Sequence, residues 1–438
     1  MSFPSDTLSI VLAGGVGSRL APLTDERAKP AVPFGGQYRI IDFTLSNCLH
    51  SGLRRILVLT QYKSDSLHNH LRDAWSVFSP ELGEFITAVP PQQRNGDSWY
   101  QGTADAIYQN LHMLRRNGTR NVLILSGDHI YRMDYSRMLE AHRTSKAEVT
   151  VACMEVSLEE ARSFGVMSVD AQQRVRRFDE KPPHPQPTPD NPHRALASMG
   201  VYVFSIDLLC QELERDSKDA SSSHDFGKDL LPRLIHSNRV FGYRFGQQDS
   251  AATNHHCESY WRDVGTIDAY HQANMDLLQD RPPLNLYSEH WPIRKSETPA
   301  PPARIDRDEM GVPGVVTDSM ISNGVVVSGG MVNRSILSPN VRVASDAVVS
   351  DSILLDGVHV GAGAKLRNCI VDKGVHIPDG ETVGEDPVLD AARFTVSENG
   401  VVVVPKGYHF ARRPTREKAT MPYLETLPKL GLVKARSL

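Results

Sequence analysis

The feature that most constrains the fold of this chain is a run of regularly spaced aliphatic residues near its C-terminus. Eleven aliphatic side chains follow one another at steps of 6, 5, 6, 6, 5, 6, 6, 5, 6 and 6 residues, so the pattern closes every 17 residues. A helix would give steps of three and four, and a strand steps of two. Steps near six predict a triangular parallel β-helix, in which each face of a coil points one aliphatic side chain inward. The eleven positions are Val326, Val332, Leu337, Val343, Val349, Leu354, Val360, Leu366, Val371, Ile377 and Val383.

The first 275 residues have a different pattern, in which short apolar runs alternate with longer amphipathic segments. The apolar runs are almost continuous, which is typical of parallel strands buried on both faces of a sheet. Alternation of such strands with helices predicts a layered α/β domain with a mostly parallel sheet. The predicted strands are residues 10–13, 55–60, 121–126 and 148–153, and the predicted helices are residues 104–115 and 135–144.

Two proline-rich segments interrupt these patterns and suggest where the domains divide. Residues 181–192 and residues 281–302 each contain six prolines, and we interpret them as a surface loop and an interdomain linker. We therefore expect an α/β domain over residues 1–280, a linker over 281–302 and a β-helix domain over 303–438.

Composition excludes several classes of protein. The chain has 48 Lys and Arg against 52 Asp and Glu, whereas nucleic-acid and membrane-surface binders usually show a basic excess. No stretch approaches 18 apolar residues, so we expect no membrane span, and we see no signal peptide. The five cysteines lack C-x-x-C spacing and are predicted to be reduced thiols in a cytoplasmic protein.

A glycine-rich segment after the first predicted strand is a candidate phosphate-binding loop. Gly14, Gly15 and Gly17 precede Arg19, and Lys29 follows ten residues later. Glycines allow backbone N–H groups to approach phosphate oxygens closely, and the two cations add fixed positive charge. The segment matches neither the dinucleotide fingerprint nor the P-loop pattern. A purely structural turn is the alternative.

Two carboxylates are candidate ligands for Mg²⁺. Asp128 directly follows the predicted strand 121–126, and ligands collect at the carboxyl ends of parallel strands. The alternative is that Asp128 caps a helix. Asp263 could complete a metal site, although local sequence alone favours an ordinary turn residue paired with Arg262.

Two further motifs are set aside at this point. Residues 224–227 read His-Asp-Phe-Gly, but the other segments of a protein kinase are missing. His359 and His376 lie one 17-residue period apart on the predicted β-helix, the kind of domain that carries the catalytic histidine in hexapeptide acyltransferases. Arg342 holds the equivalent position one coil earlier, so we interpret these residues as a row of exposed polar side chains.

The order of the motifs is similar to that of sugar-nucleotide pyrophosphorylases, and the finer segments resemble bacterial glucose-1-phosphate adenylyltransferases. The match extends from about residue 9 to about residue 395. The general motifs are residues 14–20, 29–30, 102–106, 127–129 and 180–182 followed by a β-helix, and the finer ones are residues 27–32, 39–43, 45–47, 99–100, 164–167, 197–200 and 260–266.

This resemblance implies a Rossmann-like nucleotidyltransferase domain and a left-handed parallel β-helix used for oligomerisation and regulation. It implies transfer of the adenylyl group of ATP to α-D-glucose 1-phosphate with Mg²⁺, in a homotetramer regulated by small-molecule effectors, and no nucleic-acid or membrane partner. The implied nucleotide-binding residues are Gly14, Gly15, Gly17, Gln61, Gly102 and Thr103, with Arg19, Lys29 and Asp128 as catalytic residues and Asp128 and Asp263 as metal ligands. The implied glucose 1-phosphate contacts are Tyr100, Gly165, Glu180, Lys181 and Ser198.

The sequence departs from the family pattern at the positions that bind regulators. Glu26 stands where regulated members carry a lysine, and Pro33 replaces a histidine. Arg27, Arg39 and Arg393 are the remaining candidates for contacts with an effector phosphate.

Three alternatives to this function stay open. One is a pyrophosphorylase for another nucleotide or sugar, and another is a bifunctional enzyme whose β-helix transfers acyl groups. The third is a catalytically silent regulatory subunit, against which the presence of Lys29, Asp128 and Lys181 argues.

Overall fold

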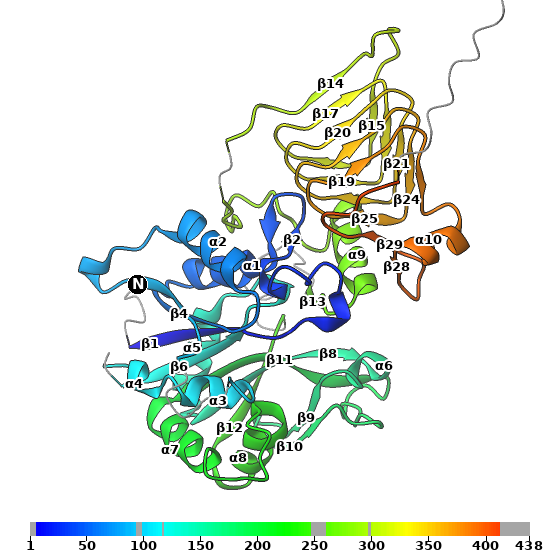
Figure 1. Ribbon diagram of the computed structural model, residues 1–438. Helices are drawn as coiled ribbons and strands as arrows, with labels where there is room; N and C mark the ends of the chain where they lie inside the picture. The colour runs from blue at the N-terminus through cyan, green and yellow to red at the C-terminus, as the bar shows by residue number, and fades with distance from the viewer. Residues whose placement is uncertain (1–5, 93–98, 116–117, 247–259, 297–298, 412–438) are drawn as a thin grey trace, which may run out of the picture.

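A mixed nine-stranded sheet forms the centre of the N-terminal part (Figure 1), and its main path has the order β10-β9-β11-β6-β1-β4-β5. The computed structural model describes residues 6–92, 99–115, 118–246, 260–296 and 299–411. Strands β6, β1, β4 and β5 run parallel, whereas β11 pairs antiparallel with β6 and also with β8. The strands are β1 (Thr7–Ala13), β4 (Arg55–Thr60), β5 (Phe85–Val89), β6 (Asn121–Ser126), β8 (Val149–Ser157), β9 (Gly165–Val169), β10 (Val175–Glu180), β11 (Arg194–Ser205) and β12 (Val240–Arg244).

Alternate residues of the parallel strands pack into two separate cores, one on each face of the sheet. In β1, Leu8 and Ile10 contribute to one core and Val11 and Ala13 to the other, and each is 2% exposed or less. The prediction of a mostly parallel sheet buried on both faces is confirmed in this half of the sheet. The helices of this part are α1 (Ile40–His50), α2 (Asp65–Trp75), α3 (Thr103–Tyr108), α4 (Leu111–Leu114), α5 (Tyr135–Thr144), α6 (Leu158–Ala161), α7 (Ile206–Asp216), α8 (Leu231–Ser237) and α9 (Ile267–Met275).

The single helix predicted over residues 104–115 is wrong, because the chain forms α3 and α4 with a break at Asn110. The Asn110 side-chain amide donates to the Ala106 carbonyl at 2.8 Å and to the Tyr100 hydroxyl at 3.0 Å. Asparagine side chains offer the backbone such alternatives to regular helix hydrogen bonds.

The C-terminal part is a stack of coils with three parallel sheets, as the aliphatic spacing predicted (Figure 1). The first sheet contains β14 (Arg304–Asp306), β17 (Val326–Ser328), β20 (Arg342–Val343), β23 (His359–Val360) and β26 (His376–Ile377). The second contains β15 (Val315–Thr317), β18 (Met331–Asn333), β21 (Val348–Ser350), β24 (Lys365–Arg367) and β27 (Thr382–Val383). The third contains β16 (Met320–Ile321), β19 (Ile336–Leu337), β22 (Ile353–Leu354), β25 (Cys369–Val371) and β29 (Val402–Val404) in parallel, and β28 (Thr395–Val396) joins its edge antiparallel to β29. Helix α10 (Pro387–Arg393) extends from the stack.

Ten of the eleven predicted inward positions are buried, and the exception is Val326. Val327, which is fully buried, takes its place and pairs with Val343. The coil from Val327 to Val343 therefore has 16 residues, one fewer than the next coil from Val343 to Val360. Because successive side chains of a strand point to opposite faces, a shift of one residue turns Val326 outward.

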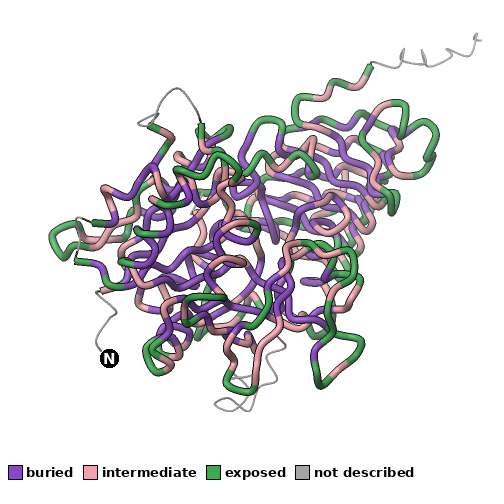
Figure 2. Tube along the Cα trace, turned by 90° about the horizontal axis from the view of Figure 1, so that it is seen from below, coloured by how far each residue is buried: buried purple, intermediate pink, exposed green. Residues whose placement is uncertain are grey.

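The two parts share a hydrophobic core. Phe34, Phe43 and Tyr270 from the N-terminal part belong to the same buried cluster as Ile353 and Val403 from the β-helix. Figure 2 shows buried residues running through the interior of both parts, with exposed residues at the periphery. In the proline-rich segment, residues 281–296 contain no helix or strand, yet Leu284 and Ile293 are buried in this shared core. The position of the domain boundary stays a prediction.

Four cysteines lie in the described ranges, and all four are free and buried, whereas Cys257 lies outside those ranges. None of the helices that the structure describes has the length and apolar content that a membrane crossing requires.

Candidate active site

The glycine-rich segment forms a loop at the carboxyl end of β1, next to the ends of β4 and β6. Gly17 has a φ of 67°, in the left-handed region that glycine adopts without strain. The Thr24 hydroxyl donates to the Gly17 carbonyl at 2.9 Å and holds this turn. The exposed Arg19 guanidinium lies against Gly265, where a Cβ would be 3.1 Å from its Nη2 atom. The glycine loop and one cation therefore border the same opening.

Lys29 lies between the two predicted metal ligands. Its Nζ atom donates to Asp128 Oδ2 at 2.9 Å and to Asp263 Oδ1 at 2.8 Å. The Lys29 side chain is only 8% exposed, and those of Asp128 and Asp263 are 30% and 23% exposed. Three residues that are far apart in sequence thus form one compact charged group.

Pairing of two short strands places Asp263 in this group. Strand β7 (His129–Tyr131) pairs antiparallel with β13 (Trp261–Asp263), and Asp263 lies opposite His129. Both local alternatives are wrong. Asp128 is followed by a strand and does not cap a helix, and Arg262 pairs with Asp276 at 3.5 Å instead of with Asp263.

The charges of the group determine its protonation. Burial alone would raise the pKa of Asp128, but Lys29, His129 and the Ser126 hydroxyl outweigh burial and hold that pKa far below its usual range. Burial alone would lower the pKa of Lys29, but the two carboxylates raise it above its usual value. Both carboxylate and ammonium are therefore charged at neutral pH.

The group suits a divalent cation by the chemistry of its donor atoms. Mg²⁺ prefers carboxylate oxygens, and one oxygen each of Asp128 and Asp263 lies within 4.8 Å of the other and of a His129 ring nitrogen. Lys29 occupies the space between the carboxylates, which shows that this space attracts positive charge. His129 Nδ1 is buried and has no hydrogen-bond partner among the described residues.

A cavity of about 640 Å³ opens next to this group, within the size range of small-molecule sites. Predicted nucleotide-binding, catalytic and glucose 1-phosphate-binding residues all line this cavity. They are Gly14, Gly15, Gly17, Arg19, Lys29, Gln61, Tyr100, Gly102, Thr103, Asp128 and Glu180.

The other four predicted residues lie beside the cavity without lining it. A Cβ on Gly165 would be 2.9 Å from Glu180 Oε2, and Ser198 Oγ is 3.5 Å from the hydroxyl of Tyr202, which does line the cavity. Lys181 has a 64% exposed side chain whose Nζ atom is 3.6 Å from Glu180 Oε1. Asp263 borders an adjoining hollow of about 800 Å³.

Asp225 and Tyr202 also line the cavity, and neither was predicted as a site residue from the sequence. Asp225 belongs to the His-Asp-Phe-Gly segment, which was set aside because it lacks the context of a kinase. Its carboxylate contributes to raising the pKa of Glu180 above the usual value, a shift for which burial is the main cause. The sequence signal that could have identified Asp225 is a carboxylate directly before Phe-Gly. No sequence signal identifies Tyr202, because its surroundings are those of an ordinary strand residue.

The three arginines predicted to bind effectors lie in different surroundings. Arg27 forms a two-pronged ion pair with Asp372 and is buried. Arg393, the last residue of α10, pairs with Glu381 at 2.9 Å. Arg39 borders a cavity of about 580 Å³ between the two parts of the chain, together with Lys295 and Lys373.

Comparisons with known proteins agree with this geometry. Residues 8–280 match the nucleotidyl transferase family model, and residues 301–404 match the GlmU-like C-terminal hexapeptide model. Glucose-1-phosphate adenylyltransferase 2 of Vibrio vulnificus (strain YJ016) is 59% identical over 92% of this chain and 100% of its own length. The protein of the same name from Vibrio cholerae is 56% identical over 93% of this chain and 99% of its own length. Glucose-1-phosphate adenylyltransferase of Paramagnetospirillum magneticum is 52% identical over 91% of this chain and 93% of its own length.

Proposed function

The chain belongs to the glucose-1-phosphate adenylyltransferases, and on that premise we propose how its residues divide the reaction. The enzyme transfers the adenylyl group of ATP to α-D-glucose 1-phosphate, the first committed step of bacterial glycogen synthesis. A phosphate oxygen of the sugar phosphate forms a bond to the α-phosphorus. The bond from that phosphorus to the bridging oxygen breaks, and pyrophosphate leaves. The nucleophile is already anionic at neutral pH, so the reaction needs no general base.

The nucleotide half of the site consists of the glycine loop, Arg19 and Lys29. The difficulty of the reaction is repulsion between anions and the charge that accumulates at the α-phosphorus and on the leaving pyrophosphate. Catalysis is therefore positioning and charge neutralisation, as in other phosphoryl-type transfers. Arg19 faces the loop and is exposed, which leaves its guanidinium available for the triphosphate. Gln61 and Thr103 border the same cavity and are assigned to nucleotide contacts.

Asp128 and Asp263 are assigned as ligands of Mg²⁺, which neutralises phosphate charge when bound. The support for this assignment is the pair of carboxylates held 2.9 and 2.8 Å from one ammonium. Asp128 and Asp263 would hold the cation through the carboxylates that now pair with the Lys29 ammonium. Lys29 would then be available to pair with nucleotide phosphates.

The sugar half of the site consists of residues on the β9–β11 side. Glu180 lines the cavity, and its carboxylate can accept hydrogen bonds from sugar hydroxyls. The exposed ammonium of Lys181 lies beside it, 3.6 Å from Glu180 Oε1, and is assigned to the phosphate of glucose 1-phosphate. Tyr100, Gly165 and Ser198 are assigned to shaping this half.

The observation that carries the function is the charged group of Lys29, Asp128 and Asp263 at the mouth of a cavity lined by a glycine loop. Pyrophosphate release with ATP, glucose 1-phosphate and Mg²⁺ tests it. A panel of nucleoside triphosphates and sugar phosphates separates this enzyme from other pyrophosphorylases. Dependence on acetyl-CoA would identify an acyltransferase, and absence of turnover a regulatory subunit.

Replacing Lys181 should weaken binding of the sugar phosphate selectively. In Lys181→Ala, we expect KM for glucose 1-phosphate to rise at least tenfold while KM for ATP changes less than about twofold, because the contact exists in both ground and transition states. Initial-rate kinetics with each substrate varied in turn measure this. Lys365→Ala, which removes an exposed lysine on β24 of the β-helix, is the control. An equal rise in both KM values would contradict the assignment.

We propose that the interdomain cavity beside Arg39 and Lys373 binds anionic effectors. Burial lowers the pKa of Arg39 below its usual value, and burial together with the nearby Arg39 charge lowers that of Lys373. Two crowded cations at an opening of about 580 Å³ attract a phosphate or carboxylate.

Assembly of a homotetramer through the β-helix is likewise proposed, and it agrees with the exposed Met310 and Met331 side chains on the first coils.

Glu26 should weaken the response to doubly phosphorylated effectors. Its carboxylate pairs with Lys406, and this contact lowers its pKa, so it is a fixed negative charge that also neutralises a cation of the β-helix part. We expect weak activation by fructose 1,6-bisphosphate in the wild type. In Glu26→Lys, half-maximal activation should need roughly tenfold less bisphosphate, because repulsion is removed and Lys406 is released.

Activity titrations with fructose 1,6-bisphosphate, fructose 6-phosphate and pyruvate measure this difference. Glu159→Lys, an equal charge change on α6, controls for net charge. Strong micromolar activation of the wild type by the bisphosphate, unchanged in Glu26→Lys, would show that position 26 does not affect effector choice.

A further inference from the structure

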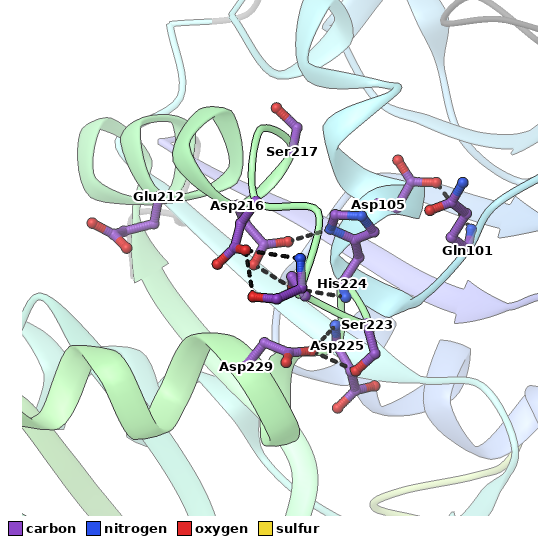
Figure 3. A network of polar contacts seen from close by, with 12 residues as sticks. Gln101, Asp105, Glu212, Asp216, Ser217, Ser223, His224, Asp225 and Asp229 are labelled. Carbon is purple, nitrogen blue, oxygen red and sulfur yellow. Dashed lines mark hydrogen bonds and ion pairs between the residues drawn. The ribbon is translucent and has the colours of Figure 1, made fainter.

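A network of polar contacts joins the end of α7 to the first turn of α3 through residues 222–226 (Figure 3). Asp216, the last residue of α7, is 2% exposed. His224 Nδ1 donates to Asp216 Oδ2 at 2.7 Å, and the Ser222 hydroxyl donates to Asp216 Oδ1 at 2.8 Å. The backbone N–H of His224 donates to Ser222 Oγ at 2.9 Å. Both carboxylate oxygens therefore hold the same short segment of chain.

Hydrogen bonds dock this segment on the first turn of α3. The His224 carbonyl accepts from the Ala104 N–H at 2.8 Å, and the Phe226 N–H donates to Thr103 Oγ1 at 3.1 Å. A Cβ on Gly102 would be 2.3 Å from the His224 carbonyl oxygen, so the two backbones touch where a side chain would not fit. Ala104 and Ile107 of α3 are buried in the core, so the start of α3 is the fixed base against which the His224 segment is placed.

The same segment fixes the carboxylate of Asp225. Thr103 Oγ1 donates to Asp225 Oδ2 at 2.9 Å, and the N–H groups of Gly227 and Lys228 donate to Oδ1 at 2.9 and 3.1 Å. A Cβ on Gly227 would be 2.6 Å from Glu180 Oε2. Asp225, Gly227 and Glu180 all line the cavity, whereas neither His224 nor Asp216 does.

We infer that the Asp216–His224 pair is a positioning device for the sugar half of the site, an inference that rests on the proposed function. The pair anchors residues 222–229 to the end of α7 and so sets where Asp225 and Gly227 meet Glu180. His224 is a positioning residue because it acts through its neighbours and does not face the cavity. The network explains why a His-Asp-Phe-Gly segment occurs in a chain without other kinase features.

Kinetics of His224→Leu test the inference. KM for glucose 1-phosphate should rise about tenfold, while KM for ATP stays within about twofold of the wild-type value. In His224→Asn the side-chain amide N–H can occupy the position of Nδ1–H, so this variant should restore most of the affinity. His142→Leu is the matched control, because His142 is a buried histidine of the same domain that contacts Thr150 at 2.8 Å. It should lower stability without separating the two KM values.

Amide hydrogen exchange without substrates gives a second readout that does not depend on the reaction. The amides of Ala104, Phe226 and Gly227 should exchange at least fivefold faster in His224→Leu than in the wild type and at unchanged rates in His142→Leu. If His224→Leu does not fold, Ser222→Ala removes one link of the network and should raise KM for glucose 1-phosphate about threefold.

The two hypotheses fail in different ways. If the wild type does not form ADP-glucose, the proposed function is wrong, and the exchange experiment still tests the anchoring. If the wild type is active but His224→Leu and His142→Leu change both KM values alike, or His224→Asn behaves as His224→Leu, the positioning role is wrong.

Discussion

Asp128→Asn is expected to reduce kcat at least a hundredfold while the fold is retained. Asparagine has nearly the same size as aspartate but lacks its charge, so the variant loses one of two anionic ligands for Mg²⁺. The lost stabilisation of transition-state charge corresponds to about 3 kcal/mol or more. Lys29 keeps its contact with Asp263 at 2.8 Å, so the loop around it should remain in place. Steady-state rates at saturating ATP and glucose 1-phosphate measure the loss, and circular dichroism checks the fold.

Asp134→Asn is the matched control for this variant. Asp134 caps α5 by accepting from the Ser136 N–H at 2.9 Å, and it does not line the cavity. Asparagine caps helices as well as aspartate does, so this variant should keep its activity although it loses the same charge. Mn²⁺ binding, followed by electron paramagnetic resonance, should weaken in Asp128→Asn alone. Retention of more than a tenth of wild-type turnover would contradict the role of Asp128 as a metal ligand.

Local sequence predicted the elements of the fold well where one strand or coil has its own pattern. The strands at residues 55–60 and 121–126 and the helix at 135–144 have the predicted bounds. The two strands are buried on both faces and have almost continuous apolar residues, whereas the helix is buried on one face and has apolar residues at helical spacing. The β-helix was predictable for the same reason, because every coil repeats one steric requirement. The coil that begins at β17 is the exception, since Val326 and Val327 are both valine and the pattern cannot choose between them.

The active site was only partly predictable, because long-range pairing assembles it. Asp263 reaches Lys29 through the ladder of β7 and β13, and Lys29 and Asp263 are 234 residues apart. No local pattern encodes that contact, and the family resemblance implied Asp263 only as a metal ligand. Asp225 was overlooked because its neighbours matched a motif from an unrelated fold, whereas its role depends on the approach of Thr103 from α3.

The second large effect concerns the ion pair that joins the two parts of the chain. Arg27 Nη1 and Nη2 donate to Asp372 Oδ1 at 3.0 Å, and Nη2 also donates to Oδ2 at 3.1 Å. The two side chains are 6% and 1% exposed. Removing one partner of a buried pair leaves the other charge unpaired and typically costs about 3–5 kcal/mol. Lys373 and Arg39 lie nearby, so loss of the carboxylate also leaves three cations close together.

We therefore expect Asp372→Ala to lower the midpoint of thermal unfolding by roughly 6 °C or more, from about 2 °C per kcal/mol for a domain of this size. Glu214→Ala, which breaks an exposed pair with Arg115, is the control and should cost less than about 1 kcal/mol. The double variant Arg27→Met with Asp372→Leu should recover most of the loss, because apolar residues of similar size can replace a buried pair. Scanning calorimetry of all variants at one protein concentration decides the matter. Equal midpoints for Asp372→Ala and Glu214→Ala would show that the pair does not hold the two parts of the chain together.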